Sequence, residues 1–548
     1  MKYYLSFLLV SLLLFSCSEK PNVRIHILGD STTEQQNQNL KDQRGWPQML
    51  PHFFTDNVTV LNHGKSGTSS RTFYEGVWWK NARLTIQPGD YVVIQFAHND
   101  EKHQGYDGAT GTVANGSYRE YLQKFVDEIK ELDAVPVFAT PIVRKMGRTG
   151  ETVSRRSSHD LAEYVAASID QSVDPADTIS FNYPYNMKLV AAENGCPVID
   201  MTASTAALVN ELGFEIATRR IYNFGDGTHI CAEGALLFSK LFADEMKAKG
   251  ILADYIIENP EIVIQPNGVD FGEVTKGAEC RQEIDLMKLK ELQQPVSFHV
   301  AAGNGVMVSD KEYGEYTTSI DLPAEFDVVY YRRLYVRIVP DAEGNFDSSI
   351  TIHDGNKSHL LAIGATVNPY LEGQRASVKY QLNGNSKPAT SGPVQAIEHT
   401  LSGLEIANFD QLGSDGLGAH LTPPVTTRAE WLRIIGGEWP KGEIDVVADR
   451  YAQFGVRAAE HTSFHLQKIS LLVGGGVSYR IQIATDPDFG DYTVIGEGSK
   501  RELTRLEIPM NQLLKEGETL YLRVYPWQTD AEYQQLCLSQ VVMEGVIE

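Results

Sequence analysis

The sequence predicts an α/β domain built on a parallel sheet, followed by two antiparallel β-sandwich domains. At 548 residues the chain is too long for one hydrophobic core. Between residues 20 and 256, short apolar segments alternate with amphipathic ones, which is typical of a parallel sheet with helices on both faces. After Asn259-Pro260 the pattern changes to alternating apolar and polar residues interrupted by Gly, Asn and Asp, which favours antiparallel sheets.

The α/β domain is expected to occupy residues 20–256. Five apolar segments are candidate strands: Val23–Leu28, Val58–Leu61, Tyr91–Phe96, Pro136–Ala139 and Pro197–Ile199. Candidate helices are Tyr118–Leu132, Asp160–Ile169 and Ala232–Lys249. In such a sheet the loops that follow the strands gather at one edge, where ligands bind.

Two β-sandwich domains are expected at residues 257–370 and 371–548. The segment Pro266–Val274 resembles the start of immunoglobulin-like modules of exported bacterial proteins. In the second unit Tyr479–Ile483 and Thr519–Val524 are candidate strands, and this unit is a candidate carbohydrate-associated domain.

The amino-terminal residues 1–17 have the pattern of an export signal. A short basic start precedes an apolar run that is too short for a typical membrane-spanning helix. The residues before Cys17 resemble a bacterial lipobox, which implies cleavage before Cys17 and acylation of its thiol. We therefore expect an exported protein of the bacterial cell envelope, tethered to a membrane by lipid on the periplasmic side or the outer surface. An ordinary signal peptide with an incidental Cys17 is the alternative.

Composition restricts the partners. The formal net charge of −23 argues against nucleic acid, because phosphate binding needs a basic surface. The cysteines form no CxxC pair and no cluster with zinc-ligand spacing. The serine chemistry described below needs neither a metal nor an organic cofactor, so none is expected. In an exported protein Cys196 and Cys231 could form a disulfide, which the sequence leaves open.

Ser31 is the candidate nucleophile. It follows the first strand in Leu28-Gly29-Asp30-Ser31-Thr32, on a turn that Gly29 permits. A serine hydroxyl needs a base near neutral pH, and Asp226-Gly227-Thr228-His229 supplies a candidate base with a carboxylate three residues before it. This spacing lets Asp226 orient the imidazole of His229 towards Ser31.

Acyl transfer also requires donors for the developing oxyanion. The backbone N–H of Ser31, the backbone of Gly67 and the side-chain amide of Asn99 are candidates, since the last two lie after the second and third strands. Taken alone, Asn99 is uninformative, and an asparagine at such a position is more often a buried structural residue.

The order of these segments resembles that of the SGNH (GDSL-like) hydrolases, and among them the rhamnogalacturonan acetylesterase-like carbohydrate esterases. The resemblance covers residues 22 to about 250 and rests on four segments: Gly29–Thr32, Asn62–Arg71, His98–Asp100 and Asp226–His229. It implies a flavodoxin-like three-layer fold and a serine esterase that uses Ser31, His229 and Asp226, with Ser31, Gly67 and Asn99 as oxyanion donors. Ala97 departs from the glycine usual in this family, and Thr68 stands where arginine is often found.

The expected substrate is an acetylated plant cell-wall polysaccharide, most specifically rhamnogalacturonan. Acetylxylan and other pectin esters are alternatives, as are a lipase or thioesterase and a non-catalytic glycan-binding surface protein. Arg71 and His98 are candidate substrate contacts. Arg71 is one of five basic residues on loops at the expected catalytic edge that could bind the carboxylates of a uronate polymer, although it could instead pin its own loop; the five are Lys65, Arg71, Lys102, Arg144 and Lys145.

Overall fold

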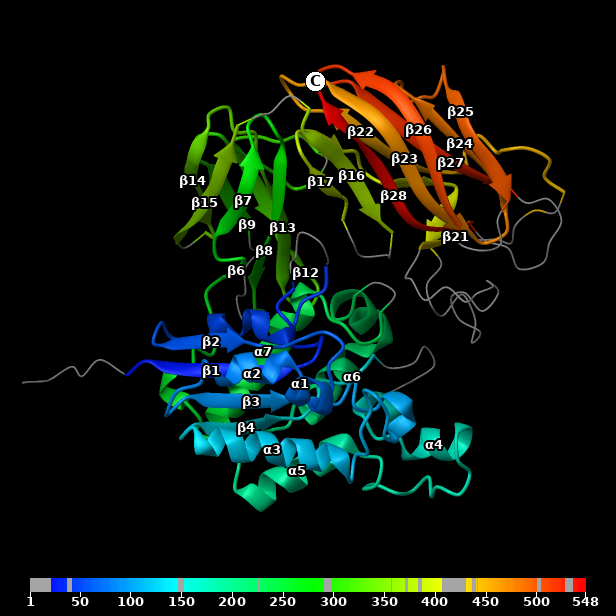
Figure 1. Ribbon diagram of the computed structural model, residues 1–548. Coiled ribbons are helices and arrows are strands. Elements are labelled where there is room, and N and C mark those ends of the chain that lie inside the picture. The colour runs from blue at the N-terminus through cyan, green and yellow to red at the C-terminus, as the bar shows by residue number, and fades with distance from the viewer. Residues whose placement is uncertain are drawn as a thin grey trace, which may run out of the picture.

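The structure is a computed structural model with an α/β domain below two β-sandwiches (Figure 1). It describes residues 21–36, 42–145, 152–223, 226–289, 297–312, 314–355, 357–369, 373–382, 387–406, 430–435, 440, 442–499, 504–527 and 536–548. Cys17 and the expected signal segment lie outside these residues. Among the described residues, no helix has the length and apolar character needed to cross a bilayer.

The α/β domain is built on a parallel sheet with strand order β2-β1-β3-β4-β5. The strands are β1 (Val23–Gly29), β2 (Val58–Asn62), β3 (Tyr91–Gln95), β4 (Val135–Ala139) and β5 (Val198–Ile199). This is the flavodoxin-like order, in which the chain reverses its winding direction between β1 and β3. The α/β class expected from the sequence is confirmed, and each predicted strand is present within one residue of its expected ends.

Helices cover both faces of this sheet. The helices that pack on one face, against a core that includes Leu28, Val92 and Phe138, are α1 (Ser70–Glu75), α2 (Val77–Arg83), α3 (Ser117–Glu131), α4 (Ala162–Ser168) and α5 (Tyr183–Asn194). The helices on the other face are η1 (Trp46–Phe53), α6 (Met201–Arg220) and α7 (Ala232–Ala248). The short turns η2 (Lys102–Gly105), η3 (Arg156–Ser158) and η4 (Ala253–Tyr255) complete the domain. The sequence pattern predicts α3, α4 and α7 but not α5, α6 or η1.

The first sandwich packs one sheet against another. One sheet has the order β10-β13-β8-β6, with β12 beside β13: β10 (Val306–Ser309), β13 (Tyr330–Ile338), β8 (Cys280–Lys288), β6 (Val263–Gln265) and β12 (Glu325–Phe326). The other has the order β11-β9-β14-β15-β7: β11 (Ser319–Pro323), β9 (Ser297–Ala302), β14 (Gly344–His353), β15 (Ser358–Asn368) and β7 (Val269–Thr275). The pairing is antiparallel, as expected, except that β15 and β7 run parallel.

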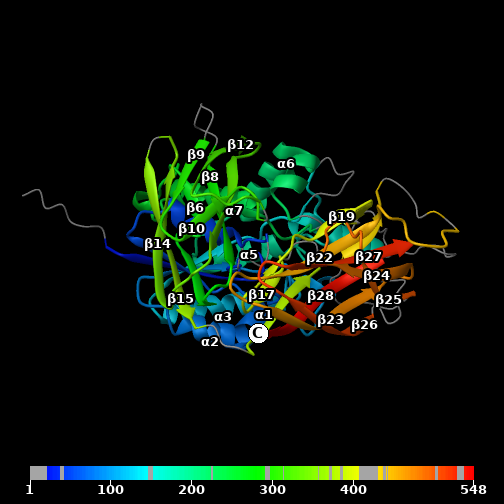
Figure 2. The ribbon, with the colours of Figure 1, turned by 90° about the horizontal axis from the view of Figure 1, so that it is seen from above.

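The second sandwich lies beside the first above the α/β domain (Figure 2). One sheet contains β17 (Ala389–Ser391), β16 (Arg375–Gln381), β28 (Leu536–Ile547), β21 (Glu430–Ile434), β20 (Leu404–Ile406), β23 (Phe464–Gly474) and β26 (Thr504–Leu514). The other contains β18 (Val394–Ala396), β19 (Thr400–Ser402), β22 (Tyr451–Ala458), β27 (Thr519–Trp527), β24 (Ser478–Ala484) and β25 (Thr493–Ser499). Its apolar core is separate from that of the first sandwich.

The first sandwich shares a core with the α/β domain. Val263, Met287 and Val329 of the sandwich are fully buried in the same apolar cluster as Trp46 and Phe242. A large apolar contact of this kind holds two domains in a fixed arrangement, whereas small polar contacts allow them to move.

The possible disulfide between Cys196 and Cys231 is absent, because both cysteines are free. The Cys231 thiol donates to the carbonyl of Arg220, with sulfur and oxygen 3.0 Å apart, whereas the Cys196 thiol faces the carbonyl of Asn194. The two thiols therefore have different surroundings.

Candidate active site

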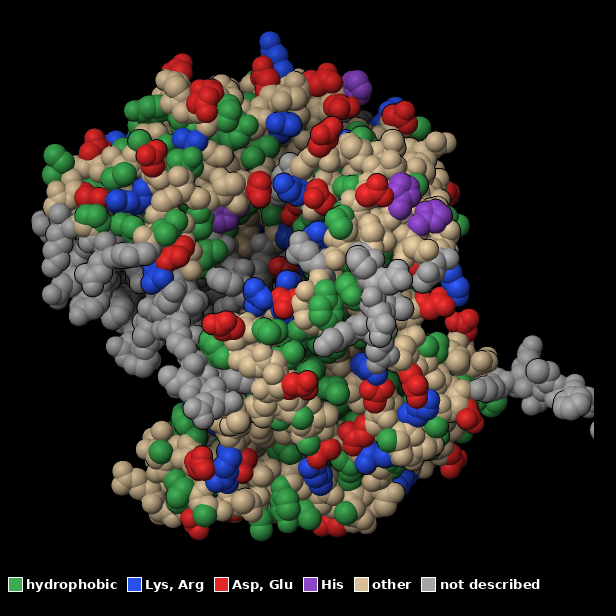
Figure 3. Space-filling model, turned by 180° about the vertical axis from the view of Figure 1, so that it is seen from behind, with side chains coloured by type: hydrophobic (Ala, Val, Ile, Leu, Met, Phe, Trp, Pro, Cys, Tyr) green, Lys and Arg blue, Asp and Glu red, His purple; other side chains and the backbone are tan. Residues whose placement is uncertain are grey.

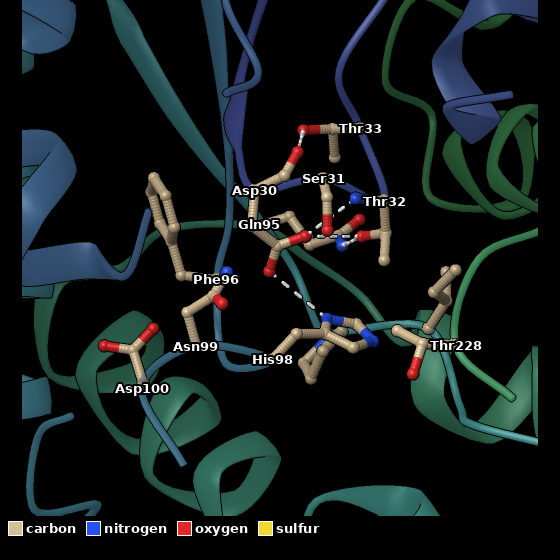
Figure 4. Close-up of polar contacts among 12 residues, drawn as sticks. Asp30, Ser31, Thr32, Thr33, Gln95, Phe96, His98, Asn99, Asp100 and Thr228 are labelled. Atoms are coloured by element: carbon tan, nitrogen blue, oxygen red, sulfur yellow. Dashed lines mark hydrogen bonds and ion pairs between the residues drawn. The ribbon is translucent and has the colours of Figure 1, made fainter. Parts of the chain in front are cut away.

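Ser31 lies directly beyond the carboxyl end of β1, on a turn held by Asp30. One carboxylate oxygen of Asp30 accepts hydrogen bonds from the backbone N–H of Thr32 at 2.9 Å and from its hydroxyl at 2.8 Å (Figure 4). A Cβ atom at Gly29 would lie 2.5 Å from the Thr33 hydroxyl and 2.7 Å from the Gln95 carbonyl, so the turn can form only with glycine at this position.

The structure brings Ser31, His229 and Asp226 together. The Nε2 atom of His229 lies 2.8 Å from the Ser31 hydroxyl, and its Nδ1 atom lies 2.7 Å from a carboxylate oxygen of Asp226. The Asp226 carboxylate can only accept at this distance, so Nδ1 carries the proton and Nε2 is left to accept the serine proton.

The carboxylate of Asp226 is held in its ionised form. Its second oxygen accepts from the backbone N–H of Thr228 at 2.7 Å and of His229 at 3.1 Å. Burial alone would raise the pKa of Asp226, but its interactions with His229 and with these N–H groups outweigh burial and hold the pKa well below its usual range. An ionised Asp226 can stabilise the imidazolium that forms when His229 takes a proton.

Gly67 and Asn99 lie on the neighbouring loops after β2 and β3. Gly67 has φ of 81°, in the left-handed region that favours glycine, and a Cβ there would meet no atom within 4 Å. The buried amide of Asn99 donates to the carbonyl of Thr68 at 2.8 Å and so holds the loop that carries Gly67. Ala97 is not among the described residues with positive φ, so replacing the usual glycine causes no backbone strain.

His98 faces inward and not towards the cleft. It is 4% exposed, and its Nδ1 atom lies 3.2 Å from the second carboxylate oxygen of Asp30 (Figure 4). Burial lowers the pKa of His98 to about 4, so the neutral ring donates to Asp30 from Nδ1. In this structure His98 therefore supports the turn that presents Ser31, and its expected contact with substrate stays a prediction.

Arg71 is also placed differently from the expectation. Its guanidinium donates to the carbonyl of Gly108 at 2.6 Å and to the Asp107 carboxylate at 2.7 Å, and it lies over the ring of Tyr121. These contacts hold the guanidinium against neighbouring parts of the chain. The geometry therefore fits the alternative in which Arg71 pins its own loop, and it does not fit the expected contact with the carboxylates of a substrate.

Two other basic candidates are paired within the chain. The ammonium of Lys65 lies 2.8 Å from the carboxylate of Glu34, and the guanidinium of Arg144 donates to Glu101. The sequence placed these residues correctly at the catalytic edge, but it could not show which carboxylates lie opposite them.

A partly buried network that the sequence did not indicate links the loops after β3 and β4 to the loop of His229. Arg144 donates through Nε to Glu101 at 2.9 Å and through Nη1 to the hydroxyl of Thr228. The other oxygen of Glu101 lies 2.9 Å from Nδ1 of His159, whose Nε2 lies 2.8 Å from the carbonyl of Ile142. His159 lies after β4, between η3 and α4.

The arrangement suits acyl transfer through a covalent intermediate. It places the Ser31 hydroxyl within hydrogen-bond distance of the oriented imidazole of His229. It also places near Ser31 the loop of Gly67, which the buried amide of Asn99 holds.

Comparison with known proteins relates this chain to a family of lipases and acylhydrolases and to acetylesterases. Residues 27–235 match the model of the GDSL-like lipase/acylhydrolase family. The chain is 30% identical over 251 residues to rhamnogalacturonan acetylesterase RhgT of Bacillus subtilis, an alignment that covers 43% of this chain and 96% of the relative. It is 26% identical to the probable rhamnogalacturonan acetylesterase YesY of the same organism, over 43% of this chain and 97% of the relative. A rhamnogalacturonan acetylesterase of Emericella nidulans is 24% identical over 42% of this chain and 88% of its own length.

Proposed function

Since the chain belongs to the GDSL-like lipase/acylhydrolase family and is a carbohydrate acetylesterase, we propose that it removes acetyl groups from rhamnogalacturonan, with Ser31 as nucleophile. The single observation that carries the proposed chemistry is the 2.8 Å separation of the Ser31 hydroxyl from His229, whose other nitrogen lies 2.7 Å from Asp226. The proposed polymer is supported by the activities named for RhgT and YesY.

The reaction proceeds in two steps. His229 takes the hydroxyl proton as Ser31 attacks the acetyl carbonyl, and the oxyanion is stabilised by the backbone N–H groups of Ser31 and Gly67 and by the amide of Asn99. The imidazolium of His229 then protonates the sugar oxygen as its bond to the acetyl carbon breaks, so the sugar leaves with a free hydroxyl and the acetyl group stays on Ser31. Water attacks this ester with His229 again acting as the base, and acetate and free Ser31 result.

Acetate release from a panel of acetylated polysaccharides tests the substrate. Acetylated rhamnogalacturonan should be turned over faster than acetylxylan and acetylated homogalacturonan, and Ser31→Ala should abolish release from each of them. Faster turnover of acetylxylan would overturn the proposed polymer but not the esterase chemistry. An active Ser31→Ala variant would overturn the chemistry as well.

We also propose that the protein is exported and tethered to a membrane of the bacterial envelope through acylated Cys17. The support is the sequence pattern of residues 1–17. Cys17→Ala should move the esterase activity from the membrane fraction to the soluble fraction, and activity that stays with the membranes would refute the lipid anchor.

A further inference from the structure

Residues 42–46 of the α/β domain contact both the first β-sandwich and the catalytic loops. This segment lies between the loop that carries Ser31 and the loop that carries His229. On one side the backbone N–H of Trp46 donates to the carbonyl of Thr32 at 2.9 Å. A Cβ at Gly45 would lie 2.4 Å from the Glu34 carbonyl, which shows how closely the two stretches of backbone approach.

On its other side the segment contacts the residue after the catalytic base. The backbone N–H of Arg44 donates to the carbonyl of Ile230 at 2.9 Å, and the two residues form an isolated antiparallel bridge. Gln43, the residue before Arg44, faces the carbonyl of Ser31 itself, with its amide nitrogen 3.4 Å away. Any shift of this segment would therefore move Ser31 and His229 relative to each other.

The side chain of Arg44 points away from the site and into the sandwich. It is fully buried, and its Nη2 atom lies 2.9 Å from the carboxylate of Asp285 and 3.2 Å from that of Glu283. Both carboxylates come from β8 and are also buried. A buried guanidinium between two buried carboxylates is held in one position, because leaving any of the three charges without a partner is strongly unfavourable.

A second contact fixes the same segment. Arg333 of β13 lies 2.7 Å from the carboxylate of Asp42 and 3.2 Å from that of Asp285, and the hydroxyl of Tyr331 donates to Asp285 at 2.8 Å. Burial raises the pKa of Asp285, but Arg333 and Arg44 outweigh it and keep this carboxylate ionised. Charged side chains of both signs are visible in the hollow between the α/β domain and the sandwiches (Figure 3).

From these contacts we infer that Arg44 is a positioning residue through which the first β-sandwich holds Ser31 and His229 in register. The inference rests on the proposed roles of these two residues. It gives the sandwich a part in catalysis that requires no contact with substrate. It also accounts for the position of Arg44, which is fully buried and directly follows Gln43, the residue that faces the carbonyl of Ser31.

The test uses the full chain and two readouts, which are turnover of p-nitrophenyl acetate and the rate at which a fluorophosphonate labels Ser31. Arg44→Met and Asp285→Asn should each lower kcat and the labelling rate by a similar factor of about 10²-fold, because a displacement of the order of 1 Å is enough for such a loss. KM should change less than about twofold, and Arg44→Lys should recover part of the loss. Asp285→Asn keeps the inference testable if Arg44→Met does not fold.

The matched control is Asp327→Asn. Asp327 forms another ion pair across the same interface, with Nε of Arg220 at 2.9 Å, and Arg220 lies outside residues 42–46. This variant should lose thermal stability while keeping kcat and the labelling rate within about twofold of the wild type. Folded Arg44→Met or Asp285→Asn variants with wild-type labelling would overturn the inference, as would a loss of equal size in Asp327→Asn. A wild-type chain that fails to label at Ser31 would instead refute the proposed nucleophile.

Discussion

Replacing Glu101 by glutamine should destabilise the catalytic domain in a pH-dependent way. The Glu101 side chain is 12% exposed and lies between the guanidinium of Arg144 and the ring of His159. Burial would raise its pKa, but Arg144 and then His159 outweigh burial and lower the pKa from 4.5 to about 2. Glutamine keeps the size of the side chain and removes the charge that these two partners stabilise.

The lowered pKa sets the size and the direction of the effect. A folded-state pKa of about 2 against 4.5 in the unfolded chain corresponds to about 3 kcal/mol of stability at neutral pH. Because the folded pKa is the lower one, this contribution is complete above pH 4.5 and is lost as the pH falls towards 2. At pH 3 about 1 kcal/mol of it remains, so the difference between the wild type and Glu101→Gln should shrink accordingly.

Urea denaturation followed by tryptophan fluorescence at pH 7 and pH 3 measures this difference. Glu193→Gln is the matched control, since Glu193 pairs with Arg119 but is 54% exposed, and it should change stability by less than about 0.5 kcal/mol at either pH. A loss of stability in Glu101→Gln that is equal at both pH values would refute the electrostatic explanation and would indicate lost packing.

Three further predictions concern catalysis by the folded enzyme. Asp226→Asn should lower kcat on p-nitrophenyl acetate by about 10⁴-fold, because an amide does not hold His229 in the tautomer that accepts from serine; retention of a tenth of the activity would contradict this role. Asn99→Ala should lower kcat by about 10²–10³-fold with little change in KM, as measured by steady-state kinetics, and an unchanged kcat would remove Asn99 from the oxyanion site. Arg71→Ala should impair turnover of a neutral acetate ester and of a uronate polymer to the same extent, since its contact with Asp107 supports a loop; a KM increase confined to the polymer would show that Arg71 binds substrate after all.

The sequence predicted those strands and helices in which the pattern of buried residues is the same from one end of the element to the other. Strand β3 is buried at Val92, Val93 and Ile94, and such an apolar run is readily recognised. Helix α6 was not predicted, since it is interrupted at Gly213, where φ is 75°, and its buried face includes the polar residues Thr202 and Thr205, which weaken the apolar pattern. The turn η1 was missed for a related reason, because Pro47 and Pro51 suggest a loop.

In the site, the sequence indicated the residues whose partners lie on loops with recognisable motifs. Asp226 and His229 are three residues apart, a spacing that allows their contact, and the order of the four motif segments supported it. The direction in which His98 points could not be inferred, because a histidine next to Asn99 can face either the cleft or the core. The partners of Arg44 could not be inferred either, because Asp285 belongs to a different domain and only the docking of the two domains brings Arg44 and Asp285 together.

The direction of β1 has a consequence for how the enzyme meets its polysaccharide substrate. Val23 begins this strand at the amino-terminal ends of the parallel strands, and Ser31 follows the opposite end of the strand, which is about 20 Å away at the rise of an extended chain. With the acyl anchor proposed at Cys17, the chain enters the domain at the edge remote from the catalytic serine. The site of Ser31 would then lie at the end of the strands away from the anchored segment, where an acetylated polysaccharide can reach it.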